Sequence, residues 1–241
     1  MQALTAHQIL LVWETGRDQH PLDQGLTILL AGLPGSSWDE LANLSIGQRD
    51  RLLLYLHAAT FGPRLQSLAR CPACSEQVEF DLDTPSLWLE TAGDEGGLVP
   101  YQAVSGEDLF FRAPTSRDLA VVARLNDSAS ARRQLVTLCQ VTSEGAKPAA
   151  ELTEEDILSL AACMAEKDPQ ANIEIVLECP ACGTRWTLLL DILTFFWREI
   201  SAEAQRLVLE VHTLARAYGW REVDILAMGA ARRQLYLEMV A

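Results

Sequence analysis

Helical patterns dominate the chain on both sides of its middle segment. Two stretches, 37–40 and 45–48, match the Ser-x-x-Glu/Gln capping signature that begins a helix. The second stretch opens a leucine-rich run from Gln48 to Phe61, which Gly62-Pro63 ends. These patterns predict an N-terminal helical region with a well-defined helix over 48–61.

The longest predicted helix runs from about Asp191 to Tyr218 and ends at Gly219. Its apolar residues are alternately four and three positions apart, a heptad pattern that places them on one seam. The seam contains Leu193, Trp197, Ile200, Ala204, Leu207, Val211, Leu214 and Tyr218. Either it packs on the protein's own N-terminal helices, or it accepts a partner. In the second case the partner-binding residues are these, except Ala204, together with Trp220. At a rise of 1.5 Å per residue this helix would be about 40 Å long.

Strand-like patterns stand beside two short cysteine motifs. Residues 77–82, after the first motif, alternate polar and apolar as a half-buried strand does. Residues 173–177 and 186–189, on either side of the second motif, are rich in strand-forming side chains. We therefore expect strands to flank both motifs.

The two motifs have the same sequence, Cys-Pro-Ala-Cys, and contribute Cys71, Cys74, Cys179 and Cys182. Two thiolates three positions apart can bind one ion from a tight turn, and a structural zinc takes four such ligands in a tetrahedron. The sequence thus predicts one structural zinc ion in a four-cysteine zinc ribbon. The two cysteine pairs of a zinc ribbon are usually about 15–20 residues apart, whereas 104 residues separate the two pairs in this chain.

Two other interpretations also fit these four cysteines. A thioredoxin-type redox pair shares the spacing, but such a motif occurs once and opens a helix after a strand. Metal-free remnants of the two motifs are a further alternative. The remaining cysteines, Cys139 and Cys163, lie in apolar helical stretches and are expected to be small core residues.

The segment between the motifs, residues 75–178, holds nearly all the net charge. It has 20 acidic and seven basic side chains, a balance of −13, while the rest of the chain has a balance of −1. The charge either keeps a solvated surface soluble or forms a docking face for a basic partner.

This acidic segment carries element signals of its own. They predict a glycine-rich loop at Thr91–Gly106, a strand near Leu109–Arg112, and helices around Asp118 and Leu160. The last helix starts at Thr153, with Asp156 placed as in a capping box. A linker at Thr142–Ala150 separates the helices.

Composition and motifs exclude several function classes. A hydrophobic content of 49% with six Trp indicates a globular protein. No signal peptide and no bilayer-length apolar run are seen, so a cytoplasmic protein is expected. Phosphate-loop, HExxH and GxSxG motifs are missing, and the histidines are scattered, with His57 and His212 in apolar helices. We predict neither an enzyme nor a small-molecule binder. Only two lysines and a net charge of −14 weigh against nucleic-acid binding.

Four runs of the sequence, in this order, resemble the baseplate hub assembly chaperones of contractile-tailed phages. They are LSIGQRDRLLLYLHAATFGPRLQSLARCPAC, FRAPTSRDL, ECPACGTRW and LVLEVHTLARAYGWREVDILAMGAARRQLYLEMV. The resemblance covers most of the chain and is clearest at residues 45–74 and 212–240. Relatives of that family also occur in bacterial contractile injection system loci. The resemblance implies a role in assembling the central hub of a baseplate.

The sequence as a whole predicts an α+β, mostly α-helical protein. Its helical body would carry a split four-cysteine zinc ribbon with a long acidic α/β insertion at 75–178. We expect three regions: N-terminal helices at 1–70, the ribbon with its insertion at 71–186, and C-terminal helices at 187–241.

The function predicted on this basis is a non-enzymatic assembly factor that binds baseplate hub or spike proteins in the bacterial cytoplasm. The alternatives are a structural part of the tail baseplate and a cytosolic zinc-ribbon adaptor. The long helix is also a candidate for self-association.

Overall fold

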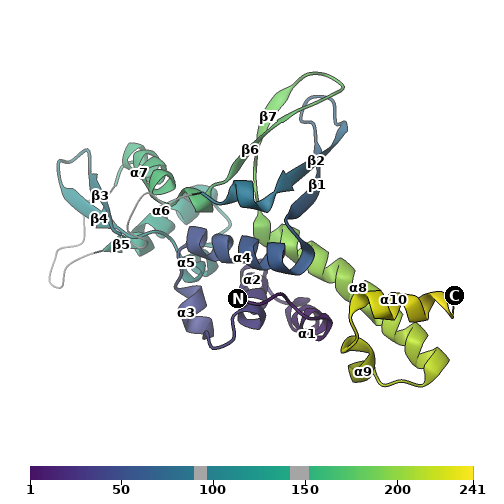
Figure 1. The fold of residues 1–241 in the computed structure, drawn as a ribbon. Coiled ribbons are helices and arrows are strands. Elements are labelled where there is room, and N and C mark those ends of the chain that lie inside the picture. The colour runs from purple at the N-terminus through teal and green to yellow at the C-terminus, as the bar shows by residue number, and fades with distance from the viewer. Residues whose placement is uncertain (90–96, 142–151, 241) are drawn as a thin grey trace. The chain divides into compact units, whose positions relative to one another are not determined.

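The computed structural model describes residues 1–89, 97–141 and 152–240, and the chain forms two compact units (Figure 1). One unit consists of Met1–Ser36, Leu53–Gly62 and Asp191–Ala241, and the other of Ser37–Leu52 and Pro63–Leu190. Helices predominate and the sheets are small, so the predicted α+β, mostly α-helical class is confirmed. The predicted linker at 142–150, and most of the first half of the glycine-rich loop, lie outside the described residues.

The first unit is helical throughout its described length. Its elements are α1 (Ala6–Gly16), α2 (Pro21–Gly32), the second half of α4 (Ile46–Phe61), α8 (Ile192–Tyr218), α9 (Glu222–Leu226) and α10 (Ala230–Glu238). The Asp191 side chain caps α8 by accepting from the Thr194 backbone N–H, and Gly219 ends the helix with a φ of 70°. That left-handed conformation is the one glycine adopts without steric cost. The predicted long helix and its stop signal are confirmed.

The C-terminal helices α9 and α10 pack along α8 (Figure 1). A buried ion pair fixes α10 there, because Arg233 Nε donates to Glu210 Oε2 at 2.7 Å. Arg233 Nη1 also donates to the Met228 carbonyl oxygen at 2.6 Å, and Arg206 binds the second Glu210 oxygen. The buried guanidinium and carboxylate therefore satisfy one another rather than facing solvent.

His57 lies in the part of α4 that belongs to this unit, and it is completely buried. Its ring packs against Phe61, Phe195 and Phe196, and its Nε2 contacts the Glu199 carboxylate. A packed role was expected for both histidines in apolar helices; it is confirmed for His57 and wrong for His212, which is exposed on α8.

The second unit contains all the strands in the described residues. Its elements are α3 (Trp38–Ala42), the first turns of α4, β1 (Arg64–Arg70), β2 (Gln77–Asp83), η1 (Thr84–Leu87), β3 (Val99–Gln102), β4 (Asp108–Phe111), α5 (Ser116–Val122), α6 (Ser128–Cys139), β5 (Gln140–Val141), α7 (Glu154–Lys167), η2 (Pro169–Ala171), β6 (Glu174–Glu178) and β7 (Arg185–Leu189). They make three antiparallel sheets, ordered β1-β2, β3-β4-β5 and β6-β7. The predicted strands at β2, β4, β6 and β7 are confirmed, whereas β1, β3 and β5 were not predicted. The loop prediction for Thr91–Gly106 is wrong at Val99–Gln102, because these residues form β3 by pairing with β4.

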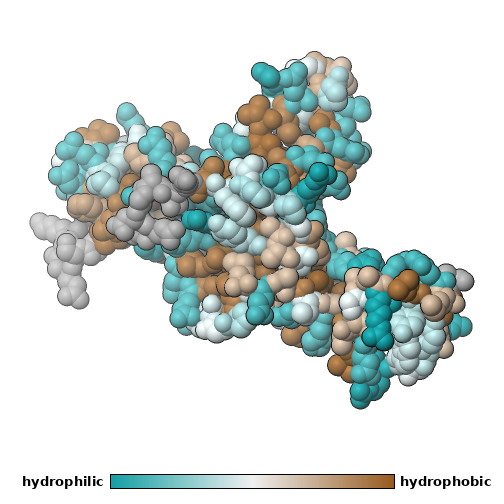
Figure 2. All heavy atoms as spheres, in the orientation of Figure 1, coloured by the Kyte–Doolittle hydropathy of each residue, from teal (hydrophilic) through white to brown (hydrophobic). Residues whose placement is uncertain are grey.

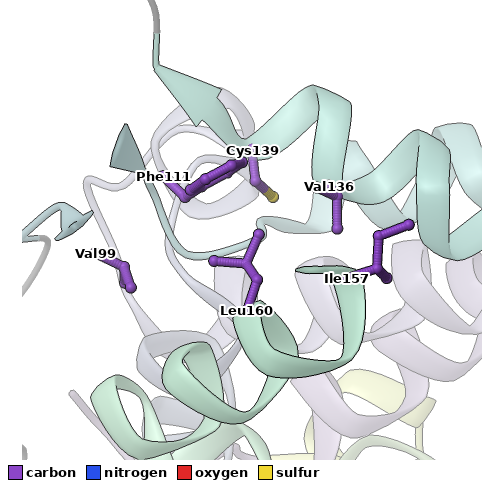
Figure 3. Close-up of a cluster of buried hydrophobic side chains, with 6 residues drawn as sticks. All are labelled: Val99, Phe111, Val136, Cys139, Ile157 and Leu160. Atoms are coloured by element: carbon purple, nitrogen blue, oxygen red, sulfur yellow. The ribbon is translucent and has the colours of Figure 1, made fainter. Parts of the chain in front are cut away.

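Between the cysteine motifs, the three-stranded sheet and helices α6 and α7 share an apolar cluster. Figure 3 shows its buried side chains directed toward one another: Val99, Phe111, Val136, Cys139, Ile157 and Leu160. Cys139 is fully buried there and Cys163 packs against the cluster, which confirms their predicted core role. Burial raises the pKa of the Cys139 thiol to about 11, so this group stays neutral at physiological pH.

The capping signals of this unit form as predicted. Thr153 and Asp156 make a full capping box on α7, and the Asp156 carboxylate also accepts from Tyr101 Oη and the Val104 backbone N–H. These hydrogen bonds, of which that from the Thr153 side chain has the largest effect, lower the pKa of Asp156 to about 2. One carboxylate thus joins the start of α7 to the β3–β4 hairpin.

The first turn of α4 is tied to a residue far along the chain. Ser45 and Gln48 exchange capping hydrogen bonds, as predicted. The Gly47 backbone N–H donates to Asp168 Oδ2 at 3.0 Å, in a buried contact between residues 121 positions apart. A carboxylate is stabilised at this helix end because the helix dipole and the free N–H groups attract negative charge.

Replacing Gly47 by alanine is expected to destabilise this unit. An added Cβ would lie 1.8 Å from Asp168 Oδ1, so the carboxylate must move away from the helix end. Overpacking of this kind costs about 1–3 kcal/mol, and displacing the carboxylate also breaks its hydrogen bond with the Gly47 N–H. The two costs together exceed the roughly 1 kcal/mol that alanine gains over glycine in a helix. Chemical denaturation measures the change.

Gly229→Ala serves as the control, since a Cβ there meets no atom within 4 Å. If Gly47→Ala were as stable as Gly229→Ala, the contact with Asp168 would not constrain the helix end.

Candidate metal centre

Each Cys-Pro-Ala-Cys motif forms the turn of a β hairpin. In the first hairpin Arg70 of β1 pairs with Gln77 of β2, and in the second Glu178 of β6 pairs with Arg185 of β7. Both turns therefore hold the same six-residue connection, which begins with the first cysteine of the motif. Figure 1 shows the two hairpins side by side.

The two turns also have the same backbone hydrogen bonds. In the first, Cys71 N–H donates to the Glu76 carbonyl and Ser75 N–H donates to the Cys71 carbonyl, both at 2.9 Å. In the second, Cys179 N–H donates to the Thr184 carbonyl at 2.9 Å and Gly183 N–H to the Cys179 carbonyl at 2.8 Å. The chain therefore builds one turn geometry twice.

The residue after the second cysteine is left-handed in both turns. Gly183 has a φ of 72° and Ser75 a φ of 63°. A serine adopts this region at a cost that glycine avoids. The hydrogen bond from the Ser75 N–H to the Cys71 carbonyl holds Ser75 in this conformation.

The four cysteine sulfurs converge between the two hairpins. All four Sγ atoms lie within 4.8 Å of one another, with Cys71 and Cys182 at 3.6 Å and Cys74 and Cys179 at 3.5 Å. None of these cysteines forms a disulfide. Sulfurs bound to one tetrahedral zinc at 2.3 Å are about 3.8 Å apart, so this group matches a four-thiolate metal site. The predicted convergence of the two motifs is confirmed.

The site is covered on one side and open on the other. Cys71 and Cys179, the first cysteines of the two motifs, are buried with Val78, and Trp186 packs against them. The second cysteines are exposed. Each motif therefore contributes one buried and one exposed cysteine to the site.

The electrostatics of the thiols also favour a cation. Hydrogen bonds from the side chain and backbone of Thr184 lower the pKa of the Cys182 thiol to about 6. A backbone hydrogen bond at Glu76 acts to lower the pKa of Cys74, but hydrogen bonds with the neighbouring thiols, those of Cys182 and Cys179 first, outweigh it and raise that pKa to about 12. One thiolate thus opposes ionisation of the next, as like charges do. Four thiolates at this spacing would repel one another, and a cation bound between them would offset that repulsion.

A family model described as T4 bacteriophage base plate protein matches residues 5–197. The chain belongs to this family. The match includes both cysteine motifs and therefore the complete four-thiol site, and it ends within α8. It supports the predicted relationship to phage baseplate proteins. The resembling block at 212–240 lies beyond the matched residues. No curated protein and no solved structure matches the chain.

The structure places the predicted partner-binding residues of α8 in two groups. Leu193, Ile200, Leu207 and Leu214 are buried, as is Ala204 between them. Helices α1, α2, α9 and α10 contact α8, and a Cβ at Gly25 of α2 would lie 2.6 Å from Leu193 Cδ1. In this chain the buried part of the seam therefore packs on its own helices.

The second group is partly exposed and consists of Trp197, Val211, Tyr218 and Trp220. Tyr218 and Trp220 stack with ring centroids 4.4 Å apart, and both rings contact Tyr236 of α10 edge-on. These aromatic residues hold the end of α8 against α10 while keeping an edge in solvent.

Exposed apolar side chains that the sequence did not reveal lie on the outer faces of the two hairpins. Leu68 of β1 is 56% exposed on one hairpin, and Val176 of β6 and Leu189 of β7 are 69% and 58% exposed on the other. Figure 2 shows hydrophobic residues, in brown, among the surface atoms over these hairpins. Strand alternation could have indicated these exposed positions, because Leu68 in β1 and Val176 in β6 share the outward row of their strand with charged residues. We call these three residues the hairpin surface.

Membrane spanning has no support in the described part of the chain, where no helix is both long enough and apolar enough.

Proposed function

We propose that this protein is a non-enzymatic assembly factor for the central hub of a contractile phage baseplate, or of a related injection system. It acts by binding hub or spike proteins in the cytoplasm while the baseplate is built. The observation that carries the proposal is the match of residues 5–197 to the T4 base plate family. The four resembling sequence runs support the more specific role of a hub assembly chaperone.

The four-cysteine site supports a stabilising role for a single zinc ion. Cys71, Cys74, Cys179 and Cys182 would hold the ion and leave no position open for substrate, which makes the ion structural. Structural zinc supplies about 10 kcal/mol or more of binding free energy to folding. It would join two hairpins that 104 residues separate, and so fix their relative orientation.

Surface chemistry of the second unit supports protein binding. The hairpin surface exposes aliphatic side chains that a partner could cover. The segment between the motifs carries a charge of −13, which attracts partners with a basic face and repels nucleic acid. We therefore propose protein partners with basic residues around an apolar centre, and neither nucleic acid nor a small-molecule substrate.

A second candidate function is that of a structural component kept in the finished baseplate. The family description, which names base plate proteins, is compatible with this alternative as well. Both functions use the same kind of docking surface, so binding alone does not separate them. Their difference lies in whether the chain leaves the particle.

A pull-down tests the partner class. The tagged chain is purified from cells that express the hub and spike proteins of the same gene cluster, and the eluate is analysed by quantitative mass spectrometry. Hub or spike proteins are expected to co-purify, and the double variant Leu68→Glu/Val176→Glu is expected to lose them. Leu11→Glu on α1, a residue 53% exposed, is the control that should retain them. Recovery of unrelated cytosolic proteins alone would contradict the proposed function.

A further inference from the structure

The two short sulfur–sulfur distances at the metal centre both join one hairpin to the other. We propose that, when the metal is absent, a two-electron thiol oxidant such as a peroxide converts this site into two disulfides between the hairpins, Cys71–Cys182 and Cys74–Cys179. The inference builds on the proposed metal site, since it concerns the same four cysteines, but it does not depend on which metal they bind.

The geometry favours these two pairings. Their sulfurs are 3.6 and 3.5 Å apart, and a disulfide requires about 2.05 Å. Each pair therefore has to close by about 1.5 Å. Each pairing also combines a buried cysteine with an exposed one.

Bonds within a motif are less favourable for a structural reason. The turn around Cys71 and Cys74 is fixed by backbone hydrogen bonds to Ser75 and Glu76, both at 2.9 Å. The second turn is fixed in the same way. A bond between the two cysteines of one motif would have to draw them together inside that turn, at the expense of these hydrogen bonds.

The chemistry proceeds in two balanced steps. The exposed Cys182 thiolate attacks a peroxide oxygen, the O–O bond breaks, and the sulfur becomes a sulfenic acid as hydroxide leaves and takes up a proton to form water. The Cys71 thiol then loses its proton and its sulfur attacks the Cys182 sulfur, which forms the S–S bond and releases a second water after protonation. Two thiols are oxidised and one peroxide is reduced to two waters. A second peroxide oxidises Cys74 and Cys179 in the same way.

Oxidation of the site would keep the two hairpins joined. A bound metal would join them while it is present, and the disulfides would keep the same two hairpins joined after it is lost. The site would thus preserve the arrangement of the hairpins in both reducing and oxidising surroundings.

Peptide mapping of the full-length chain tests the proposal. The purified protein receives a chelator and hydrogen peroxide together, and free thiols are then alkylated. Trypsin cleaves after Arg70, Arg112, Lys167 and Arg185, so the two motifs fall in separate peptides, 71–112 and 168–185. We expect most of both peptides to appear as one linked species without reductant and to separate with it.

The pairing itself is assigned with double variants. Cys74→Ser/Cys179→Ser leaves Cys71 and Cys182 and should still form the link, whereas Cys179→Ser/Cys182→Ser leaves one motif and should oxidise more slowly. Separate peptides that each carry an internal disulfide in the wild-type chain would overturn the proposal. The metal content of the untreated protein is measured separately. Linked peptides from a protein without bound zinc would support the disulfide proposal and contradict the proposed zinc site. Bound zinc in a protein whose peptides do not become linked would support the zinc site and contradict the disulfide proposal.

Discussion

Replacing Cys71 by serine is expected to abolish stable zinc binding and to unfold both hairpins locally. Cys71 is buried at the centre of the site, within 4.8 Å of the other three sulfurs, and a serine hydroxyl does not replace a thiolate as a zinc ligand. The metal-binding free energy at such sites, about 10 kcal/mol or more, is also folding free energy. Zinc content should fall from one ion per chain to a small fraction.

The local effect is measured by hydrogen exchange. Amide protons of β1, β2, β6 and β7 should lose protection in Cys71→Ser, while those of α1, α2 and α8, which belong to the other unit, should keep it. Cys163→Ser is the matched control, because this cysteine is partly buried outside the four-thiol group. A Cys71→Ser protein with full zinc content and unchanged hairpin protection would show that the four sulfurs do not form a metal site.

Replacing Glu210 by leucine should release α10 from α8. Arg233 and Glu210 are only 3% and 6% exposed, so the substitution leaves a buried guanidinium without its carboxylate. Removing one partner of a buried ion pair costs about 3–5 kcal/mol. A lower melting temperature and faster hydrogen exchange in α10 are the expected results.

The double variant Glu210→Leu/Arg233→Leu separates the charge effect from packing. An apolar pair often replaces a buried ion pair at little cost, so the double variant should recover most of the stability that the single variant loses. Glu203→Ala is the control, because it removes a partly exposed partner of Arg206. It should lower the free energy of unfolding by less than about 1 kcal/mol. Equal losses in the single and double variants would contradict the assignment of this ion pair to the attachment of α10.

Local signals in the sequence predicted most of the elements correctly, because their determinants lie within a few residues. The capping pairs at Ser45 and Thr153 and the stop at Gly219 depend only on neighbouring side chains and backbone conformation. The strand β1 was missed because its inward row, Leu65, Ser67 and Ala69, contains two small residues. That row is a weak strand signal by itself, and its pairing with β2 supplies the missing stability.

Features that depend on tertiary contacts could not be read from the sequence. Gly47 and Asp168 are 121 positions apart, and neither residue has a local pattern that indicates the other. The seam of α8 was visible as a heptad pattern, but the pattern is the same whether the chain's own helices or a partner covers it. The four-cysteine site was predictable despite its long separation, because identical motifs provide complementary halves of one tetrahedron.

The copy number of this chain in finished particles tests its role as an assembly factor most directly. Purified tails or injection particles are analysed by quantitative mass spectrometry, with a known baseplate subunit as the internal standard. An assembly factor that leaves is expected to be absent or far below one copy per baseplate, although it binds hub or spike proteins in cell extracts. Retention at a fixed whole number of copies would contradict that role and make the protein a structural part of the baseplate.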